Sequence, residues 1–462
     1  MVKENSVLTE SSSIAGLEQV PSVIGADLEV PLVTGQSVPY ANLDYAASTP
    51  CLTDVHREVE RLLPWYSSVH RGAGFTSQVC TRVFEQARGA VRRFVGATPD
   101  SEVLFTRNTT DALNLLGRAL PPGTTVFRFS TEHHAALLPW AGARVCRMGV
   151  PTSATNAVQT LAAELAAAPE GPKLVVITGA SNVTGELWPV VELAEVARAH
   201  GARTVLDAAQ LAAHGPLELA DWDVDWVALS GHKLYAPFGA GALVGATDWL
   251  DAAEPYLAGG GATARVAEDA GRECVTWSSL PHRHEAGSPN VVGVHAMAVA
   301  CDTLSDIGWN LITKQEEELA TRLRRGLVEI PGVRQLGMWD EEHPRIGVVS
   351  FDVADCAGEP ADPRLVATAL AAEHGVGVRD GAFCAHQAVH SMLERIGGHE
   401  HNRALRASIG LGTTTEHIDR LLGALQDLVR NGPRWPYRHF DEGWSPDPDP
   451  RPVPDFLPGQ LN

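Results

Sequence analysis

The sequence predicts an α/β fold in which a large, mostly parallel sheet is flanked by helices and adjoins a smaller α+β domain. Continuous apolar runs of strand length alternate with amphipathic helical patterns over most of the chain. Strands that are apolar throughout are typical of a parallel sheet covered on both faces. With 462 residues the chain is long enough for two domains.

The larger domain is predicted near residues 60–320 from a regular alternation of strands and helices. Its strands are expected at 102–107, 124–129, 143–150, 173–180, 203–209 and 225–231. Its helices are expected at 109–120, 157–168 and 190–201. The first of these helices begins with Thr-Thr-Asp, residues that favour a helix N-terminus, and the third is amphipathic and ends at Gly201.

The smaller domain is predicted from residues 36–59 together with 325–432. Its strands and helices are expected at 345–353, 363–374, 405–412 and 416–430. Residues 1–35 are polar and Ser-rich, which predicts a mobile N-terminal arm. Residues 433–462 form a C-terminal tail so dense in Pro and Asp that it is not expected to be one regular element. The Trp and Phe residues of this tail predict that it lies over the body of the protein.

The charge and the cysteines argue against several classes of protein. A formal net charge of -20 makes binding to nucleic acid or to anionic lipid unexpected. No apolar stretch reaches the length of a membrane span, and the first residues lack the pattern of a signal peptide. The seven cysteines are scattered and odd in number, which predicts reduced thiols and a cytoplasmic location.

Lys233 is the lysine whose position predicts chemistry. It follows an apolar strand directly, in "ALSGHKLYAPFG", and Asp207 ends the strand before it in the chain. Open α/β sheets bind ligands at the carboxyl ends of their strands. We therefore expect Lys233 and Asp207 to lie close together at one edge of the sheet.

A strand-end lysine beside a strand-end carboxylate is the arrangement that a pyridoxal phosphate enzyme needs. The lysine forms the Schiff base, and the carboxylate keeps the pyridine nitrogen protonated, so that the ring stores electrons. The helix that begins at Thr109 and Thr110 offers hydroxyls and backbone N–H groups to a phosphate. Taken singly, the Asp–Lys pair is also compatible with a salt bridge, and the threonines with an ordinary cap. Together at one sheet edge, these features favour a cofactor site.

Ten motifs occur in the order found in one known family and span about residues 40–430. They are "LDYAASTP", "SSVHRGAGFTSQ", "FTRNTTDALN", "TEHHAALLPW", "SNVTGELWPV", "LDAAQ", "SGHKLYAPFG", "HEAGSPN", "VRDGAFCA" and "LRASIGLG". On these motifs the chain resembles the class V aminotransferase family of fold-type I pyridoxal phosphate enzymes, and most of all its cysteine desulfurase branch. The resemblance implies the fold-type I transferase fold, pyridoxal 5'-phosphate as cofactor and a homodimer with shared active sites.

The resemblance also implies roles for individual residues. The cofactor would be held by Lys233, Asp207, Gln210, His133, Thr109, Thr110, Ser230, His232 and the partner subunit's Ser288. The amino-acid substrate would be bound by Asn182, Arg406, His70, Ala46 and Ala47. Among these, Lys233 would form the covalent bond, His133 would stack on the ring and relay protons, and Arg406 would pair with the substrate carboxylate.

Cys384, in "GVRDGAFCAH", is the residue whose role the sequence leaves open. In the desulfurase branch the residue at this place is the nucleophile, so the resemblance implies that Cys384 takes the sulfur of cysteine as a persulfide and passes it to an acceptor protein. Arg379 and His386 are close to Cys384 in sequence, and a positive charge from either would favour its thiolate form. Alternatively, Cys384 is an inert buried thiol. A metal site is the third interpretation, and its further ligands would come from His386, His390, His399 and His401.

Three functions follow from these observations. The first is a desulfurase that converts L-cysteine to L-alanine. The second is a related enzyme acting on another amino-acid-containing metabolite: a C–S lyase, an epimerase or an aminotransferase. It is favoured by Ala382 and Phe383, which stand where many members of the branch carry paired histidines and make the thiol's surroundings more apolar. The third is a non-catalytic scaffold, which the presence of Lys233, Asp207 and Arg406 together argues against.

Overall fold

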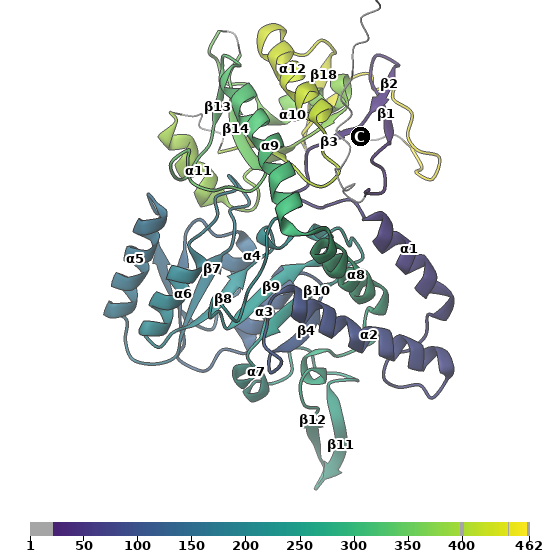
Figure 1. Cartoon of the computed structure of the whole chain (residues 1–462), viewed down its shortest axis with the longest axis vertical. Helices are drawn as coiled ribbons and strands as arrows, with labels where there is room; N and C mark the ends of the chain where they lie inside the picture. Colours follow the sequence, from purple (N-terminus) through teal and green to yellow (C-terminus); the bar gives the residue numbers. More distant parts are fainter. Residues whose placement is uncertain (1–21, 356, 398–401, 442, 460–462) are drawn as a thin grey trace, which may run out of the picture.

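The structure is a computed structural model that describes residues 22–355, 357–397, 402–441 and 443–459. A seven-stranded sheet fills the lower half of the molecule and a four-stranded sheet lies above it, as Figure 1 shows. Helix α9 (Trp309–Val328) runs from the upper part down to the lower one.

The seven-stranded sheet confirms the predicted large, mostly parallel sheet. Its strands are β4 (Glu102–Thr106), β5 (Thr125–Phe129), β6 (Arg144–Met148), β7 (Lys173–Thr178), β8 (Arg203–Asp207), β9 (Trp226–Ser230) and β10 (Gly241–Gly245). Their order is β4-β10-β9-β8-β7-β5-β6. The pairs among β5 to β9 are parallel, whereas β10 is antiparallel to both β4 and β9.

Helices cover both faces of this sheet, which explains its continuous apolar strands. Adjacent residues of a strand face opposite cores. Val103 and Phe127 face one core, whereas their neighbours Leu104 and Val126 face the other. The first core contains the helices α2 (Phe75–Phe94), α5 (Ala154–Ala167), α6 (Val190–Ala199) and α8 (Val291–Ile307). The second contains α3 (Thr109–Arg118), α4 (His134–Leu137) and α7 (Asp248–Ala252). Outside this layer, α1 (Thr53–Leu62) packs on α8.

The four-stranded sheet is antiparallel and has a core of its own. Its order is β13 (Val333–Gln335), β14 (Val348–Val353), β17 (Ala404–Ser408) and β16 (Arg379–Gly381). Helices α9, α10 (Pro363–His374) and α12 (Thr415–Asn431) pack around Phe351 and Leu405, and α11 (His386–Arg395) follows β16. A short parallel pair joins β3 (Ala41–Asn42) to β15 (Val376–Gly377).

The two ends of the chain pack on the body where the structure describes them. Within residues 22–35 of the expected arm, β1 (Glu29–Pro31) pairs with β2 (Ser37–Pro39) and Leu32 is buried. Residues 1–21 lie outside the described residues. In the tail, β18 (Tyr437–Phe440) and β19 (Gly443–Pro446) form a hairpin against α10. The extent of the domains stays a prediction.

The remaining elements are short or project from the body. They are the 3₁₀ helices η1 (Leu63–Trp65), η2 (Leu211–Ala213), η3 (Gly231–Lys233) and η4 (His282–His284), and the strands β11 (Thr263–Asp269) and β12 (Arg272–Trp277). The ribbon of β11 and β12 extends below the large sheet (Figure 1). None of the described helices alone has the length and apolarity to cross a bilayer, and α8 with α9 meets that test only as a pair bent by 83°.

Candidate active site

Lys233 and Asp207 lie side by side at the carboxyl edge of the large sheet, as predicted. Asp207 is the last residue of β8, and Lys233 follows β9 in the short helix η3. Strands β8 and β9 are parallel neighbours, so their ends meet at one edge. The prediction is confirmed for the position of both residues, although the connection between them contains only a 3₁₀ turn rather than a full helix.

Burial changes the protonation of this pair. It lowers the pKa of Lys233 to about 8, although the negative charge of Asp207 acts in the opposite direction. The same burial raises the pKa of the Asp207 carboxyl, although the charge of Lys233 opposes the shift. A lysine with a lowered pKa is neutral in a larger fraction of molecules, and the neutral amine is the nucleophilic form.

The N-terminus of α3 faces the same edge. Asn108 caps the helix by accepting a hydrogen bond from the backbone N–H of Asp111 at 3.0 Å. The backbone N–H of Thr109 donates to Ser230 Oγ at 2.8 Å, which joins the helix start to the end of β9. A Cβ at Gly241 would stand 2.6 Å from the Cα of Asn108, so β10 approaches the helix start closely only because residue 241 is glycine. The positive end of a helix dipole is therefore held against the cavity.

His133 presents a neutral ring to the cavity. Burial, together with nearby Lys233, lowers its pKa to about 3. Its Nδ1 accepts a hydrogen bond from the backbone N–H of Ala135 at 3.1 Å, so the ring proton is on Nε2. His133 thus keeps one N–H donor over a wide range of pH.

Arg406 is a buried cation on β17, not part of a surface ion pair. Its Nη1 donates to the backbone carbonyl of Asn182 at 2.9 Å, and its Nη2 lies 3.3 Å from Asp44 Oδ1. The ring of Phe383 stacks on the guanidinium, 4.8 Å from its Cζ. Its Nε is buried without a partner among the described residues. A buried donor without an acceptor is costly, which favours an anionic ligand here.

Cys384 lies on a strained turn at the mouth of the cavity and is exposed. Phe383 has φ +51° and Cys384 has φ +54°, values that non-glycine residues rarely adopt. Two hydrogen bonds hold this turn: Asn182 Nδ2 donates to the Phe383 carbonyl at 2.8 Å, and the N–H of His134 donates to the Cys384 carbonyl at 2.8 Å. The thiol is therefore not the inert buried one that the simplest interpretation of the sequence expected.

Most of the predicted residues line one cavity of about 250 Å³. Those that line it are Ala46, Ala47, Thr109, Thr110, His133, Asn182, Asp207, Ser230, His232, Lys233, Cys384 and Arg406. Gln210 lies in a small adjoining cavity that shares Lys233, Asp207 and His133, where its Nε2 donates to the carbonyl of Ala46 at 2.9 Å.

Two predicted residues, His70 and Ser288, line neither of these cavities. His70 Nε2 lies 2.7 Å from Glu85 Oε1, and the His70 ring packs edge-on against His282. Ser288 is exposed and does not line the cavity of its own chain.

The histidines after Cys384 do not form a metal site where the structure describes them. The ring of His386 packs edge-on against His134 with centroids 4.6 Å apart, and His390 Nε2 lies 3.3 Å from Glu394. The described ranges hold no group of three or more His, Cys, Asp or Glu that would bind a metal ion. His399 and His401 lie outside the described residues.

Five residues that line the 250 Å³ cavity were not predicted as binding residues from the sequence. They are Asn108, Ala135, Ala209, Arg379 and Phe383. Asp44, which pairs with Arg406, was missed as well, although it lies within the quoted motif "LDYAASTP". Asp44 and Arg406 are 362 residues apart, so no local pattern predicts that they pair. The one local signal for Asp44 as a site residue is its position directly after a short apolar segment.

The chain is similar to known proteins in both sequence and structure. The model of the family described as aminotransferase class-V matches residues 41–421. A probable cysteine desulfurase from Synechocystis sp. is 32% identical over 430 residues, covering 89% of this chain and 97% of that protein. One from Halalkalibacterium halodurans is 34% identical, covering 84% and 93%. The cysteine desulfurase structure from Thermococcus onnurineus NA1 is similar with a TM-score of 0.73 and 30% identity, covering 84% and 94%.

Proposed function

Because the chain belongs to the class-V aminotransferase family, among its cysteine desulfurases, we propose that it converts L-cysteine to L-alanine with pyridoxal 5'-phosphate as cofactor. One observation carries the proposal: Lys233, Asp207, Arg406 and Cys384 line a single cavity at the N-terminus of α3. The fold is that of the fold-type I pyridoxal phosphate enzymes.

The residues present fit the proposed cofactor. The start of α3 and the hydroxyls of Thr109, Thr110 and Ser230 match the needs of a phosphate. Lys233 Nζ is the group for covalent attachment, and the buried Asp207 carboxylate would pair with the pyridinium N–H. When bound, the cofactor supplies an electron sink for the charge that develops on the substrate Cα.

The protein's own groups supply the other parts of the reaction. Arg406 binds the substrate carboxylate through its unpartnered Nε, and the free amine of Lys233 takes the Cα proton. Cys384 Sγ attacks the substrate sulfur, so that an S–S bond forms while the C–S bond to Cβ breaks. Alanine leaves after protonation, and the sulfur remains on Cys384 as a persulfide for an acceptor protein.

The direct test is incubation of the purified, cofactor-loaded protein with L-cysteine. Alanine and sulfide should appear in equal amounts in the presence of a thiol reductant. If the cofactor binds but no alanine forms, the desulfurase proposal is wrong.

Phe383 gives a reason to keep a second candidate, a C–S lyase acting on an S-substituted cysteine. Its ring lines the cavity and covers Arg406, which makes the space beside Cys384 more apolar. Such a lyase would release pyruvate and ammonia rather than alanine, so a parallel incubation with an S-substituted cysteine separates the two.

Arg406→Lys is expected to raise KM for cysteine on the order of tenfold to a hundredfold. Lysine keeps the charge but loses the forked donors, and a hydrogen bond to a charged group contributes roughly 1.5–3 kcal/mol. Steady-state kinetics give KM, and an absorbance titration with alanine measures binding without turnover. Arg403→Lys is the matched control, because Arg403 pairs with Asp380 outside the cavity. Unchanged KM and alanine affinity in Arg406→Lys would contradict the assignment.

The cofactor-free protein is expected to attach pyridoxal phosphate faster as the pH rises, with half of the maximal rate near pH 8. The pKa of Lys233 is lowered to about 8, so the amine is protonated and unreactive below that pH and neutral above it. Stopped-flow absorbance between about pH 6 and about pH 11.5 measures the rate. A midpoint at the ordinary lysine value, about pH 10.4, would contradict the environment described for Lys233.

We also propose a homodimer in the cytoplasm. The six described cysteines are free thiols, which fits a reducing compartment. Leu63, Trp65, Tyr66 and Phe75 are large apolar side chains exposed near the start of α2, and a second copy of the chain would cover them. The exposed Ser288 is then available to the cofactor phosphate of the neighbouring subunit.

A further inference from the structure

The loop of residues 181–187, between β7 and α6, is held by a segment from the other sheet. This segment, residues 338–346, connects β13 to β14. The N–H of Ile346 donates to the Gly185 carbonyl at 2.9 Å, and the N–H of Leu187 donates to the Pro344 carbonyl at 3.0 Å. The contact therefore joins the seven-stranded half of the molecule to the four-stranded half.

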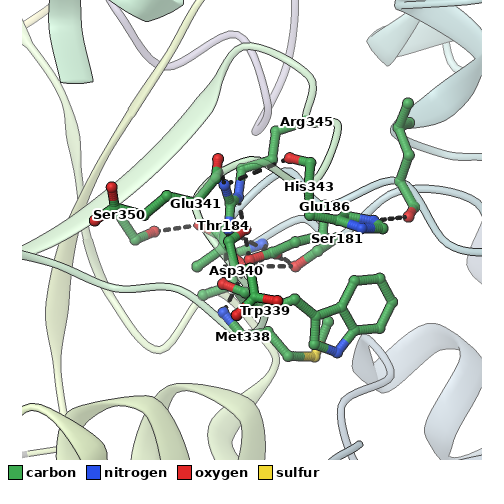
Figure 2. Close-up of polar contacts among 12 residues, drawn as sticks. Ser181, Thr184, Glu186, Met338, Trp339, Asp340, Glu341, His343, Arg345 and Ser350 are labelled. Atoms are coloured by element: carbon green, nitrogen blue, oxygen red, sulfur yellow. Dashed lines mark hydrogen bonds and ion pairs between the residues drawn. The ribbon is translucent and has the colours of Figure 1, made fainter. Parts of the chain in front are cut away.

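Arg345 and Glu186 form the centre of this contact, as Figure 2 shows. Arg345 Nε lies 3.3 Å from Glu186 Oε1, the Glu186 side chain is fully buried, and 9% of the Arg345 side chain is exposed. The other guanidinium nitrogens donate to backbone carbonyls within the segment: Nη1 to Glu341 at 2.8 Å, and Nη2 to Trp339 at 3.0 Å and to Asp340 at 2.9 Å. One arginine thus folds the segment around itself and anchors it to Glu186.

Glu186 in turn fixes the loop that carries Asn182. Its Oε1 accepts from the N–H of Met338 at 2.9 Å, and its Oε2 accepts from the Thr184 hydroxyl. Its backbone carbonyl accepts from the N–H of Ser181 at 3.0 Å, which closes the loop. A displacement of Glu186 therefore displaces Asn182.

Two routes lead from this contact to Cys384. Asn182 Nδ2 holds the Phe383 carbonyl on one side of Cys384, and the Asn182 carbonyl accepts from Arg406. On the other side, Arg395 at the end of α11 donates to the carbonyl of Met338 at 2.8 Å. Hydrogen bonds therefore connect both the Phe383–Cys384 turn and helix α11 to the contact between Arg345 and Glu186.

We propose that Arg345, acting through Glu186 and Asn182, is a positioning residue that sets the orientation of Arg406 and of the Cys384 turn. The assignment rests on the proposed function of the same cavity. A buried ion pair is a weak source of stability, because desolvation offsets its attraction, but it constrains geometry closely. Here it constrains a loop that touches both the substrate-carboxylate cation and the turn of the nucleophile.

The first test is Arg345→Lys in the cofactor-loaded enzyme. Lysine retains the charge and loses the donors to Trp339, Asp340 and Glu341, so kcat/KM should fall about tenfold to a hundredfold, as expected for a misplacement of about 1 Å. The rate at which iodoacetamide alkylates Cys384 should change as well, while the cofactor absorbance stays that of the wild type. Arg322→Lys, which alters an exposed pair with Asp419, is the matched control and should leave both rates unchanged.

The second test asks whether Arg345 acts through Asn182. The double variant of Arg345→Lys with Asn182→Ala should lose less kcat/KM than the two single losses combined, because residues in one network are non-additive. Additive losses would overturn the proposal, as would a folded Arg345→Lys protein with wild-type kcat/KM and alkylation rate. If Arg345→Lys does not fold, Glu186→Gln replaces it, since the amide keeps an acceptor for Met338 and removes the charge. Should wild type not turn over cysteine, the proposed function fails, and the alkylation rate alone decides on Arg345.

Discussion

Lys233→Ala is expected to abolish covalent attachment of pyridoxal phosphate and to lower cysteine turnover on the order of a thousandfold or more. In the proposed mechanism, the variant loses both the amine that binds the cofactor and the base that takes the Cα proton. Borohydride reduction followed by mass spectrometry measures the attachment directly. The wild-type chain should gain the mass of the reduced cofactor, and the variant should not.

Lys314→Ala is the control for this experiment. Lys314 is exposed on α9, away from the cavity, and should be neither labelled nor needed for turnover. If the Lys233→Ala protein still gained the cofactor mass, another amine would be the attachment point. The assignment of Lys233 would then be wrong even if the protein bound the cofactor.

Cys384→Ala is expected to abolish alanine formation from cysteine, by about a hundredfold or more, while the cofactor absorbance and alanine binding stay those of the wild type. The change removes the atom proposed to accept the substrate sulfur and leaves the residues proposed to hold the cofactor and the carboxylate in place. Persulfide on the wild-type chain is measured by alkylation and mass spectrometry after a single turnover. The label should be on Cys384.

Cys274→Ala is the matched control, because Cys274 is also exposed but lies on β12, outside the cavity. It should leave turnover and labelling unchanged. Sulfur release that survives in the Cys384→Ala protein would contradict the persulfide route. It would favour the C–S lyase, in which the cofactor and Lys233 suffice for cleavage.

The fold and the centre of the site were predictable because they depend on local patterns and on one geometric rule. Apolar runs identify the strands of a sheet covered on both faces, and the carboxyl ends of parallel strands meet at one edge. For that reason the sequence predicts that Asp207 and Lys233 lie together, and the parallel pairing of β8 with β9 confirms it. The start of α3 was predicted from Thr109 and Thr110 for the same kind of local reason.

Other parts of the site were not predictable, because they depend on contacts between segments far apart in the chain. Asp44 meets Arg406 across 362 positions, and Glu186 meets Arg345 across 159. Nor does a motif predict that Phe383 and Cys384 adopt positive φ, since that conformation is disfavoured for their residue types and persists only where the surroundings impose it. The expected role of His70 in substrate binding came from a motif alone, and its ring packs against His282 rather than lining the cavity.

By itself, the sequence determined the α/β class, the strand-end Asp207 and Lys233, and the presence of a cysteine that a desulfurase would need. These follow from residue type and spacing, which are local. Only the tertiary structure decided that Cys384 stands exposed on a strained turn, that Arg406 is buried with a donor unpartnered by any described residue, and that Arg345 contacts Glu186. Burial and long-range hydrogen bonds set these properties, and neither exists until the two sheets are packed together.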